Sequence, residues 1–161
     1  MLVALVESIK YVGHLLPIAF LRIFIGFMYF DAGLARARGD FLTHAYLAED
    51  IRAHLPTSLA PEWYKSFLEN VVIPNWQVFA VSITAASIAI GVSYMIGYMV
   101  RPLSLIAIAL GFGLTLALGP QPNEAQSTLL LFLHFVLGWL GAGRCFGVDY
   151  YFYKRRRGIW W

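Results

Sequence analysis

Four long apolar stretches constrain the fold of this chain more than any other feature of its sequence. They cover about residues 15–34, 76–98, 102–118 and 125–142. At a rise of about 1.5 Å per residue, a helix of roughly 20 residues crosses a hydrocarbon core about 30 Å thick. The stretches lack the two-residue alternation of barrel strands, so helices must satisfy their backbone groups. The sequence therefore predicts an all-α, polytopic membrane protein with a bundle of four transmembrane helices.

The composition agrees with this fold class. Hydrophobic residues make up 60% of the chain and charged residues 13%, whereas about 25% are charged in an average soluble protein. The spans leave too few residues for a separate soluble domain, so we expect a single membrane domain over residues 1–161. The segment 1–13 lacks the basic start and cleavage site of a signal peptide. We expect it to form the first turns of the first span or a short interfacial helix.

Basic residues predict the orientation of the bundle. Arg101 lies in the break between the second and third spans, and a basic cluster directly follows the last span: Lys154, Arg155, Arg156 and Arg157. By the positive-inside rule, both termini face the cytoplasm, which in a prokaryote means the inner membrane. The nearly neutral loop 35–75 then lies outside. We interpret the basic tail 143–161 as a topology anchor at membrane lipids rather than as a nucleic-acid site.

The outer loop has helical periodicity in two places. Asp40 is a candidate cap for a helix that runs to about His54 and ends before Pro56. Pro61 suits the first turn of a second helix, which runs to about Asn70. Each segment has an apolar stripe. We therefore predict two short amphipathic helices, which lie on the outer membrane surface or cover the mouth of the bundle.

A charged residue, Arg22, lies within the first span, where a central arginine costs about 3 kcal/mol of insertion free energy. Gly26 and Gly33 fall near the same helix face, so we expect that face to pack inward. Two interpretations of Arg22 stay open. It forms an interhelical salt bridge, with Asp149 or Glu7 as the partner, or it is a cationic donor to a quinone carbonyl or an anionic substrate.

His134 lies near the middle of the fourth span. A neutral imidazole there could ligate haem or a chlorophyll magnesium, or relay protons. A histidine that hydrogen bonds to a neighbouring helix is the simpler interpretation, and we favour it over a haem or chlorophyll ligand. The single cysteine, Cys145, excludes an internal disulfide. Because the HxxxH, CxxC and HExxH patterns are also missing, the sequence predicts no metal site.

Segments at both ends of the predicted bundle are similar to a known family. Leu21–Arg36 reads LRIFIGFMYFDAGLAR, and Gly141–Asp149 reads GAGRCFGVD. Together with FLENVVIPN at Phe67–Asn75 and the pair Arg101–Pro102, they resemble the DoxX/DoxD family of small four-helix membrane proteins. The resemblance covers nearly the whole chain.

The resemblance implies a role in a redox complex. DoxD-like proteins are the membrane part of a thiosulfate:quinone oxidoreductase, and DoxX-like proteins are linked to thiol and oxidative-stress complexes. The family positions are Arg22, Gly26, Gly33, Arg36, Arg144 and Asp149. Of these, Arg22, Arg144 and Asp149 are expected to form a polar cluster at the cytoplasmic side, which orients a quinone head group or the helices themselves. Many relatives carry a glutamate at the position of Ser87, so this chain lacks an obvious buried acid for proton transfer.

Two functions stay open from the sequence. The chain is a DoxX/DoxD-like subunit of a quinone-linked redox complex that is not catalytic on its own, or it is a purely structural accessory subunit of a larger respiratory or photosynthetic complex. The resemblance favours the first, and the missing acid and single cysteine favour the second. Both require partner subunits. The sequence leaves open whether the chain is an enzyme; a quinone is the cofactor that the first function implies.

Overall fold

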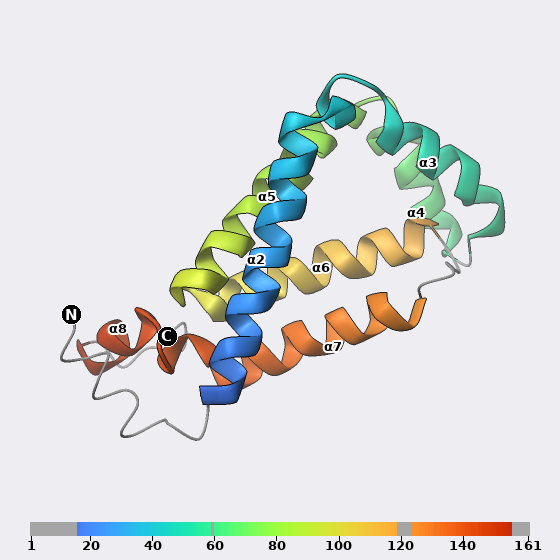
Figure 1. Cartoon of the computed structure of the whole chain (residues 1–161). Helices are drawn as coiled ribbons and strands as arrows, with labels where there is room; N and C mark the ends of the chain where they lie inside the picture. The colour runs from blue at the N-terminus through green and yellow to red at the C-terminus, as the bar shows by residue number, and fades with distance from the viewer. Residues whose placement is uncertain (1–15, 59, 119–123, 156–161) are drawn as a thin grey trace.

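The computed structural model describes residues 16–58, 60–118 and 124–155, which form helices joined by short turns (Figure 1). No strand occurs in these ranges. Three helices are long and apolar enough to cross a membrane: α2 (Leu16–Arg38), α5 (Trp76–Ile96) and α6 (Val100–Leu118). The structure thus confirms an all-helical fold with three such helices. Segment 1–13 and the basic residues 156 and 157 lie outside the described residues.

The fourth predicted span corresponds to α7 (Glu124–Leu140), whose apolar part, Ser127–Leu140, is shorter than the other three helices. A count of four spans therefore stays a prediction. The helix ends also differ slightly from the predicted spans. Helix α2 continues to Arg38, past the predicted end at residue 34. Helix α5 ends before Gly97, because Gly97 adopts a left-handed conformation with φ of 71° and its N–H donates to the Ser93 carbonyl.

The long helices form two antiparallel pairs that meet at one end and diverge at the other (Figure 1). Helix α2 packs along α5, and α6 packs along α7. We call the end where α5 turns into α6 the closed end; it also holds η5 (Ala142–Arg144) and α8 (Asp149–Arg155). We call the opposite end, where α2 leads into α3, the open end.

The connection between α2 and α5 bridges the two helix pairs at the open end (Figure 1). It contains η2 (Asp40–Leu42), α3 (Tyr46–His54), η3 (Leu55–Thr57), α4 (Glu62–Phe67) and the π-helix η4 (Leu68–Val72). Asp40 starts only a single 3₁₀ turn, and α3 begins later than predicted, at Tyr46. Helix α3 buries Leu47, Ala48 and Ile51 in a core shared with Leu68 and Val72. The location of these helices at a membrane surface stays a prediction.

Glycines allow α2 and α5 to pack closely. A Cβ on Gly26 would lie 2.8 Å from the Cβ of Tyr94, and a Cβ on Gly91 would lie 2.5 Å from the backbone nitrogen of Phe30. Within a membrane, such close backbone contact supplies the packing energy that holds helices together.

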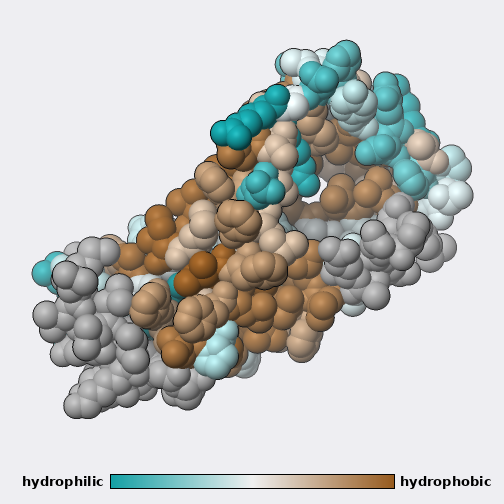
Figure 2. All heavy atoms as spheres, in the orientation of Figure 1, coloured by the Kyte–Doolittle hydropathy of each residue, from teal (hydrophilic) through white to brown (hydrophobic). Residues whose placement is uncertain are grey.

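The outward faces of the long helices are apolar, as Figure 2 shows. The exposed side chains include large aromatic residues on three helices: Phe20, Phe24, Phe27, Phe112, Phe132, Phe135 and Trp139. Hydrophilic residues gather instead over α3 and the neighbouring turns at the open end (Figure 2). An exposed apolar surface of this extent is typical of a protein surrounded by lipid.

Candidate functional site

A cavity of about 430 Å³ lies between the diverging helix pairs, below the bridge formed by α3 and α4. In the space-filling view the surface is hollowed at this place (Figure 2). Most of its lining side chains are apolar, among them Met28, Leu47, Phe67, Phe79, Leu110 and Leu114. This volume is in the range of about 300–1,000 Å³ that small-molecule sites occupy.

A few polar side chains reach this cavity. Arg36, near the end of α2, donates a hydrogen bond from Nη1 to the hydroxyl of Ser87 on α5 at 3.1 Å. Ser87 in turn donates to the Ile83 carbonyl at 2.8 Å. The lining residues that the structure describes include no carboxylate. Arg36 therefore lines the cavity, and its guanidinium hydrogen bonds to the neutral hydroxyl of Ser87.

Two tyrosines also line the cavity. Tyr64, on α4, donates its hydroxyl to the Gly113 carbonyl on α6 at 2.8 Å, which ties the bridge to the second helix pair. Burial raises the pKa of this phenol above its ordinary value. The other tyrosine, Tyr29 on α2, hydrogen bonds to His134. Tyr29 lies within a motif that carried the family resemblance, but nothing in the sequence alone marks it out from other aromatic residues.

His134 lies in the bundle interior between tyrosines of two other helices. Its Nε2 is 2.8 Å from the Tyr29 hydroxyl, and its Nδ1 is 2.9 Å from the Tyr94 hydroxyl on α5. His134 is 1% exposed and Tyr94 is 0% exposed. His134 therefore hydrogen bonds to neighbouring helices, which is the interpretation that the sequence favoured over a haem or chlorophyll ligand. A haem or chlorophyll ligand would need one of these ring nitrogens to be released.

A second polar cluster lies at the closed end. Arg22 is fully buried, and its guanidinium donates to three main-chain carbonyls: Ala142 at 2.7 Å, Cys145 at 3.2 Å and Phe146 at 3.1 Å. The turn between α7 and α8 is thereby held against α2. Gly97 leaves room for this guanidinium, because a Cβ there would lie 2.5 Å from Nη1.

Asp149 belongs to the same cluster. Its buried carboxylate accepts hydrogen bonds from the N–H groups of Met99 at 2.7 Å and Val100 at 3.2 Å, at the start of α6. A carboxylate at this place satisfies free N–H groups at a helix start. Burial raises the pKa of Asp149, although these N–H groups and the charges of Arg22 and Arg144 oppose the shift.

Arg144 lies at the edge of this cluster. Its guanidinium lies 4.1 Å from the centre of the Tyr153 ring, and burial lowers its pKa. The structure therefore brings Arg22, Arg144 and Asp149 into one neighbourhood, where Arg22 and Asp149 each hold a main-chain segment by hydrogen bonds. None of the three lines the 430 Å³ cavity. Glu7, the other suggested partner of Arg22, lies outside the described residues.

The family positions on α2 divide between the two regions. Gly26 and Gly33 are buried against α5, where a Cβ on Gly33 would lie 2.7 Å from the Ile88 side chain. Arg36 alone among the family positions lines the cavity. Within the described residues, no group of three or more histidine, cysteine, aspartate or glutamate side chains could hold a metal ion.

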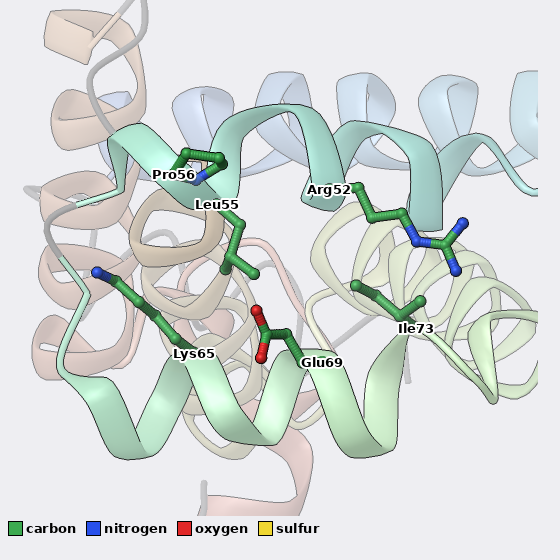
Figure 3. Close-up of a pocket in the computed structure, with 6 residues that line it drawn as sticks. All are labelled: Arg52, Leu55, Pro56, Lys65, Glu69 and Ile73. Atoms are coloured by element: carbon green, nitrogen blue, oxygen red, sulfur yellow. The ribbon is translucent and has the colours of Figure 1, made fainter.

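A second hollow, of about 490 Å³, lies on the surface between α3 and α4 (Figure 3). Its charged side chains are Arg52, Lys65 and Glu69. They do not converge on one point, since Arg52 and Lys65 lie at opposite ends of the hollow (Figure 3). Lys65 also pairs with Glu62 at 3.1 Å. The more enclosed cavity beside Arg36 is therefore the stronger candidate site.

The fold and the cavity define a class: a helical membrane protein whose bundle encloses an apolar cavity edged by an arginine and two tyrosines. Residues 18–159 match the family model described as the TQO small subunit DoxD, where TQO denotes thiosulfate:quinone oxidoreductase. The chain therefore belongs to the DoxD family. This match confirms the DoxD part of the resemblance and leaves the DoxX part a prediction. Comparisons with curated proteins and with solved structures found no match.

Proposed function

We propose that this chain is the quinone-binding membrane subunit of a thiosulfate:quinone oxidoreductase, and that the quinone head group binds in the cavity beside Arg36. One observation carries the proposal: apolar walls enclose a volume of about 430 Å³, with Arg36, Tyr29 and Ser87 at its edge. A quinone has matching chemistry, because its ring and tail are apolar and its two carbonyl oxygens accept hydrogen bonds.

The cavity is suited to stabilise the reduced quinone. Reduction places negative charge on the quinone oxygens before protons arrive, and the Arg36 side chain carries a cationic guanidinium. None of the described residues that line the cavity is a carboxylate, so they do not neutralise this positive charge. A fixed cation in a site of low dielectric constant stabilises developing negative charge strongly.

The electrons for this reaction come from outside the chain. Two thiosulfate ions, oxidised at another subunit, join through a new S–S bond and release two electrons. The quinone takes up these electrons together with two protons and becomes a quinol. The described residues hold no metal cluster or exposed thiol that could carry electrons. In this proposal the chain binds and protonates the quinone, and the other subunit oxidises thiosulfate.

We place the protein in the inner membrane of a prokaryote with the closed end toward the cytoplasm. Three basic residues support this orientation: Arg101, Lys154 and Arg155 all lie at the closed end. The positive-inside rule assigns such residues to the cytoplasmic side. The cavity then opens toward the outer half of the membrane.

The proposal is tested by Arg36→Gln in the purified complex, with thiosulfate as the donor and a short-chain quinone as the acceptor. Loss of a charged hydrogen bond is expected to raise the KM for quinone about tenfold. Arg38→Gln is the matched control, since Arg38 is exposed two residues further along α2 and does not line the cavity.

The measurement has a second readout, photolabelling of the complex with a quinone azide. Wild-type protein should be labelled on residues that line the cavity, and Arg36→Gln should reduce the labelling. If KM and labelling are both unchanged in Arg36→Gln, the cavity is not the quinone site.

A structural accessory role is the second candidate function. It is favoured by the closed-end cluster, where the charges of Arg22 and Asp149 serve main-chain segments rather than a ligand. Mass spectrometry of proteins that co-purify with a tagged copy distinguishes the two roles. A thiosulfate-oxidising partner supports the quinone-binding role. Stoichiometric subunits of a respiratory or photosynthetic complex, without quinone labelling of this chain, support the accessory role.

A further inference from the structure

We propose that Tyr29, His134 and Tyr94 form a proton relay that leads from the bundle interior into the cavity. The inference rests on the proposed function, because it assigns the protons that a quinone in the cavity takes up. Its basis is geometric. Tyr29 lines the cavity, and His134 and Tyr94 continue from its hydroxyl into the bundle interior through short hydrogen bonds.

The three side chains come from three different helices. Tyr29 is on α2, His134 on α7 and Tyr94 on α5, and the imidazole lies between the two hydroxyl groups at 2.8 Å and 2.9 Å. The surroundings are apolar, with Ile25, Ile90 and Leu137 all at most 2% exposed. Buried polar groups in such surroundings are costly unless fully hydrogen bonded, and inside membranes they commonly mark a functional path.

These hydrogen bonds permit proton transfer in one direction, from Tyr94 through His134 to Tyr29. In one tautomer, the Tyr94 hydroxyl donates to His134 Nδ1, and the Nε2–H donates to the Tyr29 oxygen. The Tyr29 hydroxyl proton then points to the cavity. A concerted shift along these bonds moves one proton to a reduced quinone oxygen. Tyr29 and His134 each lose one proton and gain another, so both remain neutral.

Tyr94 must recover the proton that it passes on. The shift leaves Tyr94 as a phenolate, and a hydronium ion from the water at the closed end returns the proton to it. Two passages supply the two protons of one quinol, while the two electrons come from thiosulfate and do not use the relay.

The relay also accounts for the absence of a buried acid from α5. A glutamate at the position of Ser87 would be an acid–base group close to the cavity, but Ser87 cannot take that role, and α5 contains no acidic residue. The Tyr29 hydroxyl takes over the delivery of the proton, and His134 and Tyr94 act through it as positioning and relay residues.

The test uses Tyr29→Phe in the assembled complex, with thiosulfate and a short-chain quinone. General acid–base groups contribute about 10²–10⁴-fold to rates. We therefore expect kcat to fall at least about tenfold, while the KM for quinone changes less than about twofold. The solvent deuterium isotope effect on kcat should rise, because proton delivery becomes rate-limiting. Tyr46→Phe, which removes an exposed hydroxyl from α3, is the matched control and should change none of these values.

Tyr94→Phe separates a relay from a structural hydrogen bond. Tyr94 does not line the cavity, so a merely structural role would lower the melting temperature and leave the isotope effect of the folded complex unchanged. A relay instead raises the isotope effect in Tyr94→Phe as in Tyr29→Phe. If both variants assemble, bind quinone and turn over with the wild-type rate and isotope effect, the relay is excluded.

Quinone photolabelling of the same complexes distinguishes failure of the relay from failure of the proposed function. Labelling of the cavity in wild type and in Tyr29→Phe, with unchanged turnover, excludes the relay and leaves the quinone site in place. Absence of labelling from the cavity in wild type contradicts the proposed function itself, and the relay with it.

Discussion

Three main-chain carbonyls surround the guanidinium of Arg22, and all three belong to the turn that follows α7. Carbonyls after a helix end have no partner within the helix, and a buried carbonyl without one costs free energy. The planar guanidinium of an arginine carries five N–H donors in fixed directions and can serve several of these carbonyls at once. At the residue scale, Arg22 therefore holds the closed end together.

We expect Arg22→Gln to destabilise the protein rather than to change quinone turnover selectively. Each hydrogen bond to a charged group contributes about 1.5–3 kcal/mol, so the loss should exceed about 3 kcal/mol. The abundance of the protein in membranes and its melting temperature in detergent should both fall, with Arg38→Gln as the control. Normal abundance together with abolished turnover would instead support a direct role of Arg22 toward the quinone.

Glycine positions dominate the contact between α2 and α5. Gly26 on α2 and Gly91 on α5 each lie so close to the opposite helix that an added methyl group would overlap main-chain atoms. This close contact also positions Tyr94 and Tyr29 on their helices relative to His134. Separation of the two helices would therefore disturb the relay as well as the fold.

At the scale of this helix pair, Gly91→Ala is expected to lower the stability of the protein by about 1–3 kcal/mol, because overpacked interiors must shift. The melting temperature in detergent measures this effect. Gly111→Ala is the control, since its new methyl group would meet only the flexible end of Leu131 at 2.9 Å. Equal melting temperatures for the two variants would contradict close packing of α2 against α5.

The long helices were predictable because each apolar stretch is a local property of the chain. The start of α3 was not predictable from local sequence. The Asp40 carbonyl accepts hydrogen bonds from the N–H groups of Thr43 and His44, and these bonds close a separate turn before α3 begins. Capping preference alone cannot decide between one long helix and a turn followed by a shorter helix.

The whole molecule is asymmetric between its two ends. The helix pairs converge at the closed end, around Arg22 and Asp149, and they diverge at the open end, where α3 and α4 cover the cavity (Figure 1). The exposed surface of the long helices is apolar on both pairs. A ligand with an apolar tail can therefore reach the cavity from the surrounding lipid.

This asymmetry gives a prediction for the orientation in the membrane. In a Cys145→Ser background, a cysteine at Ser66 on α4 should react with an impermeant maleimide added from outside. A cysteine at Lys154 on α8 should react only after the membrane is opened. Both positions are exposed in the structure. The reverse labelling pattern would place the closed end outside and contradict the positive-inside prediction.

Wild-type protein provides the control for this labelling. Cys145 is the single cysteine of the chain, it is 0% exposed, and burial raises the pKa of its thiol. Thiols react as thiolates, so the folded protein should remain unlabelled at neutral pH and become labelled once it is denatured.

The sequence by itself determined that this protein is a helical membrane protein of the DoxD type, because apolar length and short glycine and arginine motifs are local features. It also pointed to Arg22 and His134 as polar groups within spans and, through the family resemblance, to Arg36. Only the tertiary structure decided what these residues contact. Arg36 hydrogen bonds to Ser87, which is 51 positions away in the sequence. His134 hydrogen bonds to Tyr94 and Tyr29, which are 40 and 105 positions away. Such contacts depend on how the helices cross and diverge, and helical periodicity within one segment does not specify that arrangement.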